Sequence, residues 1–341
     1  MDRRYGLVGR WLAGGAFALL AGCVPAKKPV AEQSVRQASV EVVAPASPSA
    51  VENPARLPVV ESPVQVPPPK VVIPPPRIAL VLGGGAARGF AHVGVIKVLE
   101  AQGLTPEIVV GTSAGSVVGA LFASGMSGYD IQRQALDIDE KSVSDWALPN
   151  RGFLKGEALQ EYINKTVKGR TIEQMPRTLG IVATDLRTGE ATIFRRGNTG
   201  MAVRASSSVP GVFQPVLIQG REYVDGGVTS PVPVRAARDL GADMVIAVDI
   251  SKNPLRSKVG DTLDVLLQTI LIMGRALAAQ EMLAADVVIS PSTDGLATAN
   301  FDSRNLAILE GERAATAALP RIRQKLVERE GRLRDAAAKA R

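Results

Sequence analysis

The chain has 341 residues, of which 46% are hydrophobic, 4% aromatic and 21% charged, a composition typical of a folded protein rather than a disordered one. Its net charge of +7 suggests a nucleic-acid partner until the charge is divided along the chain. The first 76 residues carry three of these charges and residues 321–341 carry five, which leaves −1 for residues 77–320. A nearly neutral central region offers no basic surface for DNA or RNA, so we expect no nucleic-acid partner.

The chain contains one cysteine, Cys23, and one histidine, His92. A single cysteine excludes an intramolecular disulfide. A zinc site built from Cys and His side chains needs several of them, so such a site is excluded as well. We therefore expect no bound metal and no cofactor.

Residues 1–22 have the pattern of an export signal, with a short basic start, the apolar run Trp11–Leu20 and then Ala-Gly before Cys23. The apolar run is too short to cross a bilayer as a mature helix, which favours a signal peptide that is removed. The Leu-Ala-Gly-Cys ending resembles the lipobox of bacterial lipoproteins, in which the cysteine becomes the acylated first residue. We expect an exported, membrane-anchored bacterial lipoprotein, and the non-acidic Val24 favours the periplasmic face of the outer membrane. An ordinary secretory signal with a chance cysteine is the alternative.

Residues 23–76 form a proline-rich segment: 13 of the 23 prolines lie between residues 24 and 76. Such a composition predicts an extended, partly polyproline tether, with the folded domain spanning residues 77–320. The apolar residues 71–73 are compatible, alternatively, with a strand that packs on the domain. Residues 321–341 form a basic C-terminal tail, predicted to be a solvated helix or, alternatively, to contact anionic lipid.

Residues 77–123 alternate between strand-like and helical patterns. Arg77–Leu82 is, after its arginine, a continuous apolar run, as expected of a parallel strand covered on both faces. The pattern continues with a glycine loop at 83–89, helical spacing from His92 to Leu99, a strand at Glu107–Val110, a serine turn at Gly111–Gly115 and a helix at Val117–Ala123. This order predicts an α/β fold with a mainly parallel central sheet and helices on both faces.

Further strands are predicted at Leu179–Ala183, Met244–Asp249 and 284–290, with a helix at Val234–Leu240. The segment 261–284 is apolar and helical in pattern, interrupted by a few polar residues. We expect a packed core helix there, and a helix that contacts a membrane is the alternative.

Gly111–Gly115 has the pattern G-x-S-x-G, which places a serine on a sharp strand-to-helix turn. The pattern alone is weak in a chain with 33 glycines. Its context strengthens it, because an apolar strand precedes the turn and a helical segment follows it. Ser113 is therefore a candidate nucleophile.

A serine of this kind normally works with a histidine, but His92 lies in an apolar helical stripe and is expected to be structural. If Ser113 is a nucleophile, another group must accept its proton. Asp225 is the best candidate, because it ends the strand-like segment Arg221–Val224 and precedes two glycines. An Asp-Gly hairpin turn is the alternative.

The glycine loop at 83–89 does not fit two common nucleotide-binding motifs. Arg88 stands where a dinucleotide-binding loop has its third glycine, and the Gly-Lys-Ser/Thr ending of a Walker A loop is missing. The remaining use is a run of backbone N–H donors, which is an oxyanion hole.

Together these motifs resemble those of the bacterial patatin-like phospholipase family. Gly83–Arg88 resembles the family's oxyanion loop, Gly111–Gly115 its serine motif and Asp225-Gly226-Gly227 its Asp-Gly motif, over about residues 77–320. The segments 183–185 and 205–215 are also similar to family sequence. The resemblance implies a three-layer patatin-like α/β/α fold and a serine hydrolase with a Ser-Asp dyad. Such a lipid acyl hydrolase, of phospholipase A or lysophospholipase type, acts on carboxylic esters of lipids.

By the same resemblance Ser113 is the nucleophile and Asp225 the base. Oxyanion and substrate contacts are assigned to Gly83, Gly84, Gly85, Ala86 and Arg88, and supporting roles to Gly111, Gly115, Gly226 and Gly227. Arg88 either assists with a phosphate head group or only fixes the loop, and Asp185 is expected to brace the site. The implied partners are a phospholipid or other lipid ester and, through Cys23, a membrane. A catalytically silent, membrane-tethered binding or scaffold protein of the same fold is the alternative.

Overall fold

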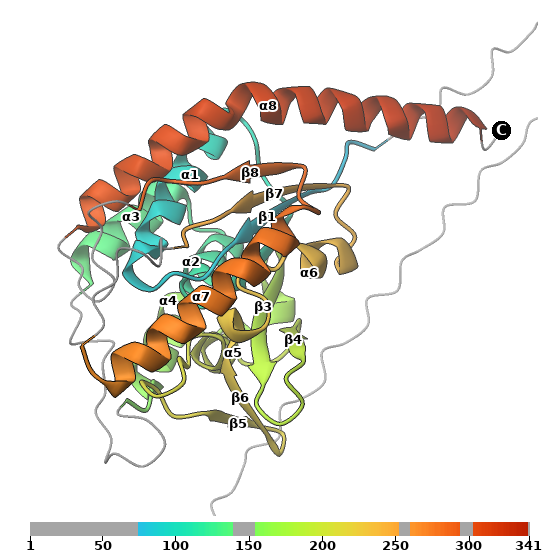
Figure 1. Ribbon diagram of the computed structural model, residues 1–341. Helices are drawn as coiled ribbons and strands as arrows, with labels where there is room; N and C mark the ends of the chain where they lie inside the picture. The colour runs from blue at the N-terminus through green and yellow to red at the C-terminus, as the bar shows by residue number, and fades with distance from the viewer. Residues whose placement is uncertain (1–73, 139–153, 252–259, 294–302, 340–341) are drawn as a thin grey trace, which may run out of the picture. The chain divides into compact units, whose positions relative to one another are not determined.

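The computed structural model describes residues 74–138, 154–251, 260–293 and 303–339 (Figure 1). The predicted signal peptide, Cys23 and the tether up to residue 73 lie outside the described residues. The strands are β1 (Ile78–Leu82), β2 (Ile108–Thr112), β3 (Thr178–Asp185), β4 (Ala191–Phe194), β5 (Val216–Ile218), β6 (Arg221–Asp225), β7 (Met244–Val248) and β8 (Val287–Ile289). The α-helices are α1 (Phe90–Ala101), α2 (Ala114–Ala123), α3 (Gly128–Asp137), α4 (Glu157–Thr166), α5 (Thr199–Ser206), α6 (Val234–Asp239), α7 (Thr262–Met282) and α8 (Arg304–Lys339). Within the described ranges, the short 3₁₀-helices η1 (Ala86–Gly89), η3 (Ile172–Gln174) and η4 (Gly226–Val228) join these elements.

The strands form one sheet of eight in the order β5-β6-β3-β2-β1-β7-β8, with β4 paired to β3. The pairs β3–β2, β2–β1, β1–β7 and β7–β8 are parallel, whereas β4, β5 and β6 pair antiparallel at one end. The parallel strands are short and almost entirely apolar, as their burial on both faces requires.

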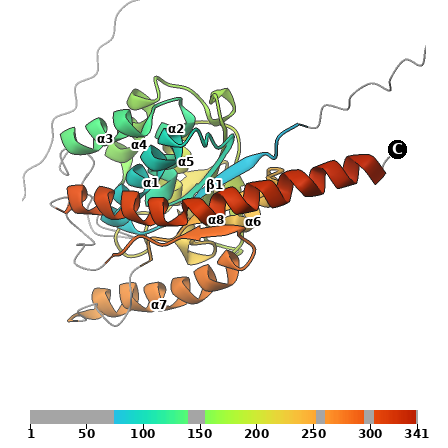
Figure 2. The same ribbon diagram turned by 90° about the horizontal axis from the view of Figure 1, so that it is seen from above.

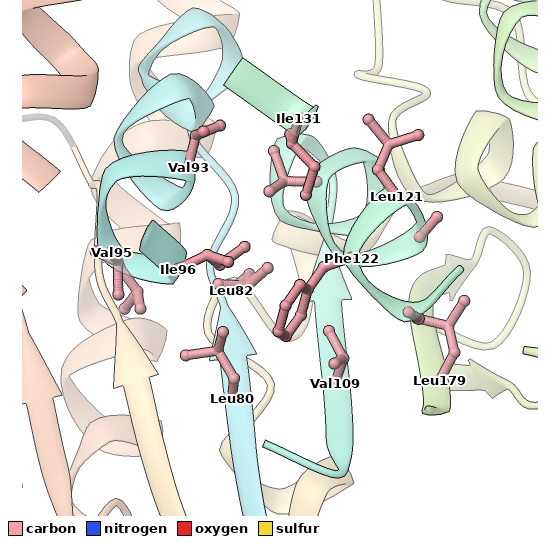
Figure 3. Close-up of a cluster of buried hydrophobic side chains, with 14 of the residues drawn as sticks. Leu80, Leu82, Val93, Val95, Ile96, Val109, Leu121, Phe122, Ile131 and Leu179 are labelled. Carbon is pink, nitrogen blue, oxygen red and sulfur yellow. The ribbon is translucent and has the colours of Figure 1, made fainter. Parts of the chain in front are cut away.

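Side chains of β1 alternate between two cores. Leu80 and Leu82 belong to the larger core, which packs α1, α2, α3 and α8 onto one face of the sheet (Figure 3). Ala79 and Val81 point to the other face, into a smaller core formed with α6 and part of α7. Helices therefore cover both faces, and the predicted three-layer α/β/α fold is confirmed.

The strand β3 changes partner along its length, and this change positions the site. Its first residues pair with parallel β2, up to Thr112 opposite Val182. Its last residues pair with antiparallel β6, beginning with Asp225 opposite Ala183. Because β4 occupies the other edge of β3 at 181–184, β2 and β6 share one edge and meet end to end. The carboxyl ends of these two strands, and the residues that follow them, therefore face each other.

The expectation of a packed core helix at 261–284 is wrong. Ala278 is the one buried residue of α7 among the described side chains. Figure 2 shows α7 as the outermost element on its side of the sheet. The physical reason is that α6 already covers the smaller core, so α7 reaches it only near its C-terminal end, where Ala278, Met282 and Ala285 pack against that core.

The helix α8 is continuous from Arg304 to Lys339 and so crosses residue 320, where the sequence suggested the end of the domain. Ile322 is fully buried in the larger core. Arg329 forms an ion pair of 2.6 Å with Asp286, just before β8. The first part of the basic tail therefore packs on the domain as the continuation of a helix.

Candidate active site

Ser113 lies on the sharp turn between β2 and α2. It has φ 53° and ψ −124°, a backbone conformation that is costly for a residue with a side chain. The turn closes only because its flanking residues are glycines. A Cβ atom at Gly111 would collide with the Gly115 carbonyl oxygen, and one at Gly115 with the Leu82 carbonyl oxygen. The predicted strand, serine turn and helix are therefore present.

A second serine, Ser206 at the end of α5, holds this turn. Its hydroxyl accepts a hydrogen bond of 2.8 Å from the Ser113 amide and donates one of 2.6 Å to the Val182 carbonyl oxygen of β3. Ser206 stands in the segment 205–215 that resembles family sequence, but no local pattern marks its role. Only the folded structure shows that it joins the turn to the sheet.

Asp225 ends β6 and faces Ser113 across the junction of the two strands. The Ser113 hydroxyl donates a hydrogen bond of 2.6 Å to Asp225 Oδ2, between residues 112 positions apart in the chain. Asp225 Oδ1 accepts a second bond of 2.7 Å from the Gly227 amide. The carboxylate is thus fixed on one side by a backbone donor and presents its other oxygen to the serine.

The Asp225 carboxylate caps η4 and does not start a hairpin turn, so the hairpin alternative is wrong. Gly226 makes this geometry possible, because a Cβ atom there would collide with the Val182 carbonyl oxygen. The pair Asp-Gly is needed for close approach to β3 and not for a reversal of the chain.

Burial changes the acidity of Asp225. The residue is 6% exposed, and removal from water raises its pKa to about 6, against the opposing effect of the hydrogen bonds from Ser113 and Gly227. A carboxylate with this pKa is ionised at neutral pH yet is a stronger base than an ordinary aspartate. It is therefore suited to accept a proton from a neighbouring hydroxyl.

The glycine loop lies beside the serine. A Cβ atom built on Gly84 would be 3.3 Å from the Ser113 Cβ. The amides of Gly83 and Gly84 already donate to the carbonyl oxygens of Val248 and Pro231, at 3.0 and 2.9 Å. Two of the amides expected to bind the oxyanion are therefore already paired with the backbone. Over the part of the chain that the structure describes, the Gly85 and Ala86 amides have no acceptor and remain available to a substrate oxyanion.

Arg88 is 4% exposed and turns inward. Its Nε donates a hydrogen bond of 2.9 Å to the Gly85 carbonyl oxygen, and burial lowers its pKa to about 10 although Asp249 raises it. Of the two roles considered for Arg88, this position fits fixing the loop rather than holding a head group.

His92 is fully buried in α1, as the apolar stripe predicts. Burial lowers its pKa to about 4, so the ring is neutral at pH 7 and its Nε2–H donates to the Gly83 carbonyl oxygen at 2.8 Å. The histidine therefore holds the glycine loop through the backbone of Gly83, and its hydrogen bond does not go to Ser113.

Asp185 lies at the end of β3. Its Oδ1 accepts bonds of 3.0 Å from the amides of Arg187 and Thr188, and its Oδ2 pairs with Arg221 at 3.3 Å. It braces the turn after β3 and the start of β6 and does not contact Ser113. Among the residues with described positions, no three His, Cys, Asp or Glu side chains are close enough together to hold a metal ion.

Comparisons with known proteins agree with this fold. An uncharacterized NTE family protein, Mb1092c of Mycobacterium bovis, is 36% identical over 179 residues, 52% of this chain and 49% of that protein. Patatin-like phospholipase domain-containing protein 6 of Homo sapiens is 34% identical over 181 residues, 51% of this chain and 13% of that protein. The matches thus span about half of the mycobacterial relative and a small part of the human one.

Among solved structures, the crystal structure of VipD from Legionella pneumophila has a TM-score of 0.52 and 16% identity, covering 72% of this chain and 67% of that one. At this identity the likeness concerns the fold alone. A family model described as "Patatin-like phospholipase" matches residues 80–238, the segment that holds the glycine loop, the serine turn and the aspartate. Residues 80–238 therefore form a patatin-like phospholipase domain.

Proposed function

We propose that the protein is a lipid acyl hydrolase in which Ser113 is the nucleophile and Asp225 the general base. The observation that carries this proposal is the hydrogen bond of 2.6 Å from the Ser113 hydroxyl to the buried Asp225 carboxylate. Such a pair is the requirement for an activated serine, and the carboxylate here takes the place that a histidine occupies in a triad.

The reaction proceeds through a covalent acyl-enzyme. Ser113 Oγ attacks the ester carbonyl carbon while its proton moves to Asp225 Oδ2, and the amides of Gly85 and Ala86 stabilise the oxyanion that forms. When the carbon–oxygen bond to the alcohol breaks, the leaving oxygen takes the proton from Asp225. A water molecule then gives a proton to Asp225 and attacks the acyl-enzyme. When the bond to Ser113 Oγ breaks, Asp225 returns this proton to the serine oxygen and the carboxylic acid leaves.

The substrate class follows from the domain's family and is therefore the less direct part of the proposal. The presence of a patatin-like phospholipase domain supports carboxylic esters of lipids as the substrate class. The specific reaction that we propose is that of a phospholipase A or a lysophospholipase. Assays of the full chain against phospholipids, lysophospholipids and simple esters would identify the preferred class.

We also propose that the chain is an exported lipoprotein anchored through acylated Cys23, with residues 23–76 as its tether. Stable attachment to a membrane needs more than one acyl chain, as a lipoprotein cysteine carries. Cys23→Ser should abolish the mass increase from acylation and shift the protein out of the membrane fraction. An unchanged mass and unchanged fractionation would contradict this anchor.

A catalytically silent scaffold is distinguished from a hydrolase by labelling with a fluorophosphonate, which reacts with activated serines. The full chain should be labelled and Ser113→Ala should not. Ser124→Ala is the matched control, because Ser124 is another buried serine, and its hydroxyl donates to the Leu121 carbonyl oxygen. Absence of labelling in the wild-type chain would favour the scaffold.

A further inference from the structure

The helix α7 presents an apolar face to solvent. Its large exposed side chains follow one side of the helix: Val265 (54% exposed), Leu266 (44%), Ile272 (53%), Met273 (55%) and Leu277 (37%). We call this set the outer face. Between residues 265 and 280 the single charged residue is Arg275, so this stretch has no acidic side chain. Large apolar side chains gathered on one exposed side of a helix mark an interaction site rather than an ordinary solvated helix.

The opposite side of α7 is fixed to the domain at three points along the helix. Near its start, Leu263 lies against Gly211, 3.1 Å from where a Cβ atom would stand. Leu266, at the edge of the outer face, reaches the same point at 3.2 Å. At its middle, Gly274 approaches the Gly227 carbonyl oxygen, at 3.5 Å from such an atom. Near its end, Glu281 accepts hydrogen bonds from the Ser230 hydroxyl and, at 3.0 Å, from the Val232 amide.

The second and third of these points lead to the candidate active site. Gly227 is the residue whose amide binds Asp225 Oδ1. The segment that Glu281 holds, 230–232, includes Ser230, whose carbonyl oxygen accepts from Thr112 Oγ1 at 2.8 Å, and Pro231, which accepts from the Gly84 amide. The helix therefore borders η4, which follows Asp225. Through residues 230–232 it is also connected to β2 and to the glycine loop.

We propose that the outer face of α7 docks the catalytic domain on a phospholipid surface. The inference rests on the proposed function, because a lipid ester held in a bilayer is reached only by a site that lies against that bilayer. The composition of this stretch fits that occupant: the apolar side chains of the outer face enter the boundary of the acyl chains, and no acidic side chain between residues 265 and 280 is there to be repelled by lipid phosphates.

The helix lies on the surface in this proposal and does not cross the bilayer. Among the described helices, α7 is the one long and apolar enough to span a membrane, with a mean hydropathy of 1.5 and 6% of that window buried. Its attachment at both ends and in the middle, however, keeps one side against the domain. An interfacial position exposes only the outer face to lipid and leaves the contacts of Gly274 and Glu281 intact.

The test uses a fluorescent probe on the full chain, which has a single native cysteine. Proteins carrying Cys23→Ser and Ser113→Ala receive one new cysteine, Met273→Cys on α7 or Leu136→Cys on α3, labelled with an environment-sensitive dye. Leu136 is 40% exposed and lies on α3, whose buried Ile131 belongs to the core on the other face of the sheet. Vesicles of phosphatidylethanolamine and phosphatidylglycerol should shift the emission at position 273 to the blue and allow quenching by nitroxide lipids, with no change at position 136.

The proposal is overturned if position 273 does not respond to vesicles or if both positions respond equally. It is also overturned if the emission at position 273 shifts with protein concentration without vesicles, since the occupant would then be a second copy of the chain. A second reporter places the dye at Thr269→Cys, so that position 273 is free to be changed. In that protein, Ile272→Ser/Met273→Ser should weaken vesicle binding by about tenfold or more.

Hydrolysis of a water-soluble ester separates this inference from the proposed function. With Ser113 intact, Ile272→Ser/Met273→Ser should hydrolyse such an ester at the wild-type rate, because docking is not needed for a dissolved substrate. If the wild-type chain hydrolyses no ester while position 273 still enters the vesicles, the proposed function fails and the docking surface stands.

Discussion

The Ser113 amide donates a hydrogen bond of 2.8 Å to the Ser206 hydroxyl, 93 positions further along the chain. The same hydroxyl donates to the Val182 carbonyl oxygen of β3, so one side chain joins the strained serine turn to the sheet. Ser113 keeps its positive φ only while the surrounding structure enforces it. Ser206 is thus a positioning residue for the nucleophile.

Ser206→Ala should reduce kcat by about tenfold to a hundredfold, because a small displacement of a reacting atom is sufficient for such a loss. The variant also leaves the Ser113 amide and the Val182 carbonyl oxygen without their partner, which should lower the free energy of unfolding by about 1–3 kcal/mol. Ser208→Ala is the matched control, since its hydroxyl donates only to the Arg204 carbonyl oxygen among described groups. Equal kcat for Ser206→Ala and Ser208→Ala would contradict the positioning role.

The pH dependence of hydrolysis should report Asp225. A general base works only when it is ionised, and burial raises the pKa of Asp225 to about 6. Measured from pH 4 upward on a soluble ester, kcat/KM should therefore rise with an apparent pKa near 6 and level off above it. A rise centred near 4, where an exposed aspartate titrates, would show that a different group limits the reaction.

The same shift predicts a cost in stability. Because the folded pKa is raised from 3.8 to about 6, the folded state binds the Asp225 proton more tightly than the unfolded state does. The free energy of unfolding therefore falls as pH rises through this window, by on the order of 3 kcal/mol for two pKa units.

Asp225→Asn removes the charge while keeping an oxygen that accepts from the Gly227 amide. Above pH 6 the inactive variant should thus be at least as stable as the wild type, and below pH 4 the advantage should disappear. Urea unfolding at pH 8 and at low pH measures this difference. A variant much less stable than the wild type at pH 8 would mean that the ionised carboxylate stabilises the fold.

Gly84→Ala tests the loop next to the nucleophile. The added methyl group would lie 3.3 Å from the Ser113 Cβ and 3.6 Å from the Thr112 side chain, a tight but tolerable contact for the fold. It should push the loop and its donors away from the serine and lower kcat by about 10²-fold, as loss of an oxyanion donor does. Gly331→Ala, where nothing lies within 4 Å, should leave kcat unchanged. Full activity of Gly84→Ala would remove this loop from the mechanism.

The elements from β1 to α2 could be predicted from the sequence because their signals are local. The apolar run before Gly83, the helical spacing after it and the G-x-S-x-G turn each lie within a few residues. Asp225 was likewise recognisable at a strand end. Its contact with Ser113 follows from β3 exchanging β2 for β6, which is a long-range pairing that no local pattern contains.

The wrong expectation that α7 is a core helix has a related cause. Its apolar content indicates burial, but the sequence does not reveal that α6 already covers that face of the sheet. Composition describes what a helix can contact, and the neighbouring elements decide whether protein is there to be contacted.

The central claim is that Ser113 and Asp225 act as a pair without His92. Its most direct test is turnover of a water-soluble fluorogenic ester by the full chain and by Ser113→Ala, Asp225→Asn, their double variant and His92→Gln, each checked for folding. Both single variants should lose at least about 10³-fold in kcat, and the double variant should lose no more, because the two residues work as one unit. His92→Gln should be less stable but keep its turnover, since the imidazole bonds to the Gly83 carbonyl oxygen. Retention of turnover in a folded Asp225→Asn, or its loss in a folded His92→Gln, would contradict the account.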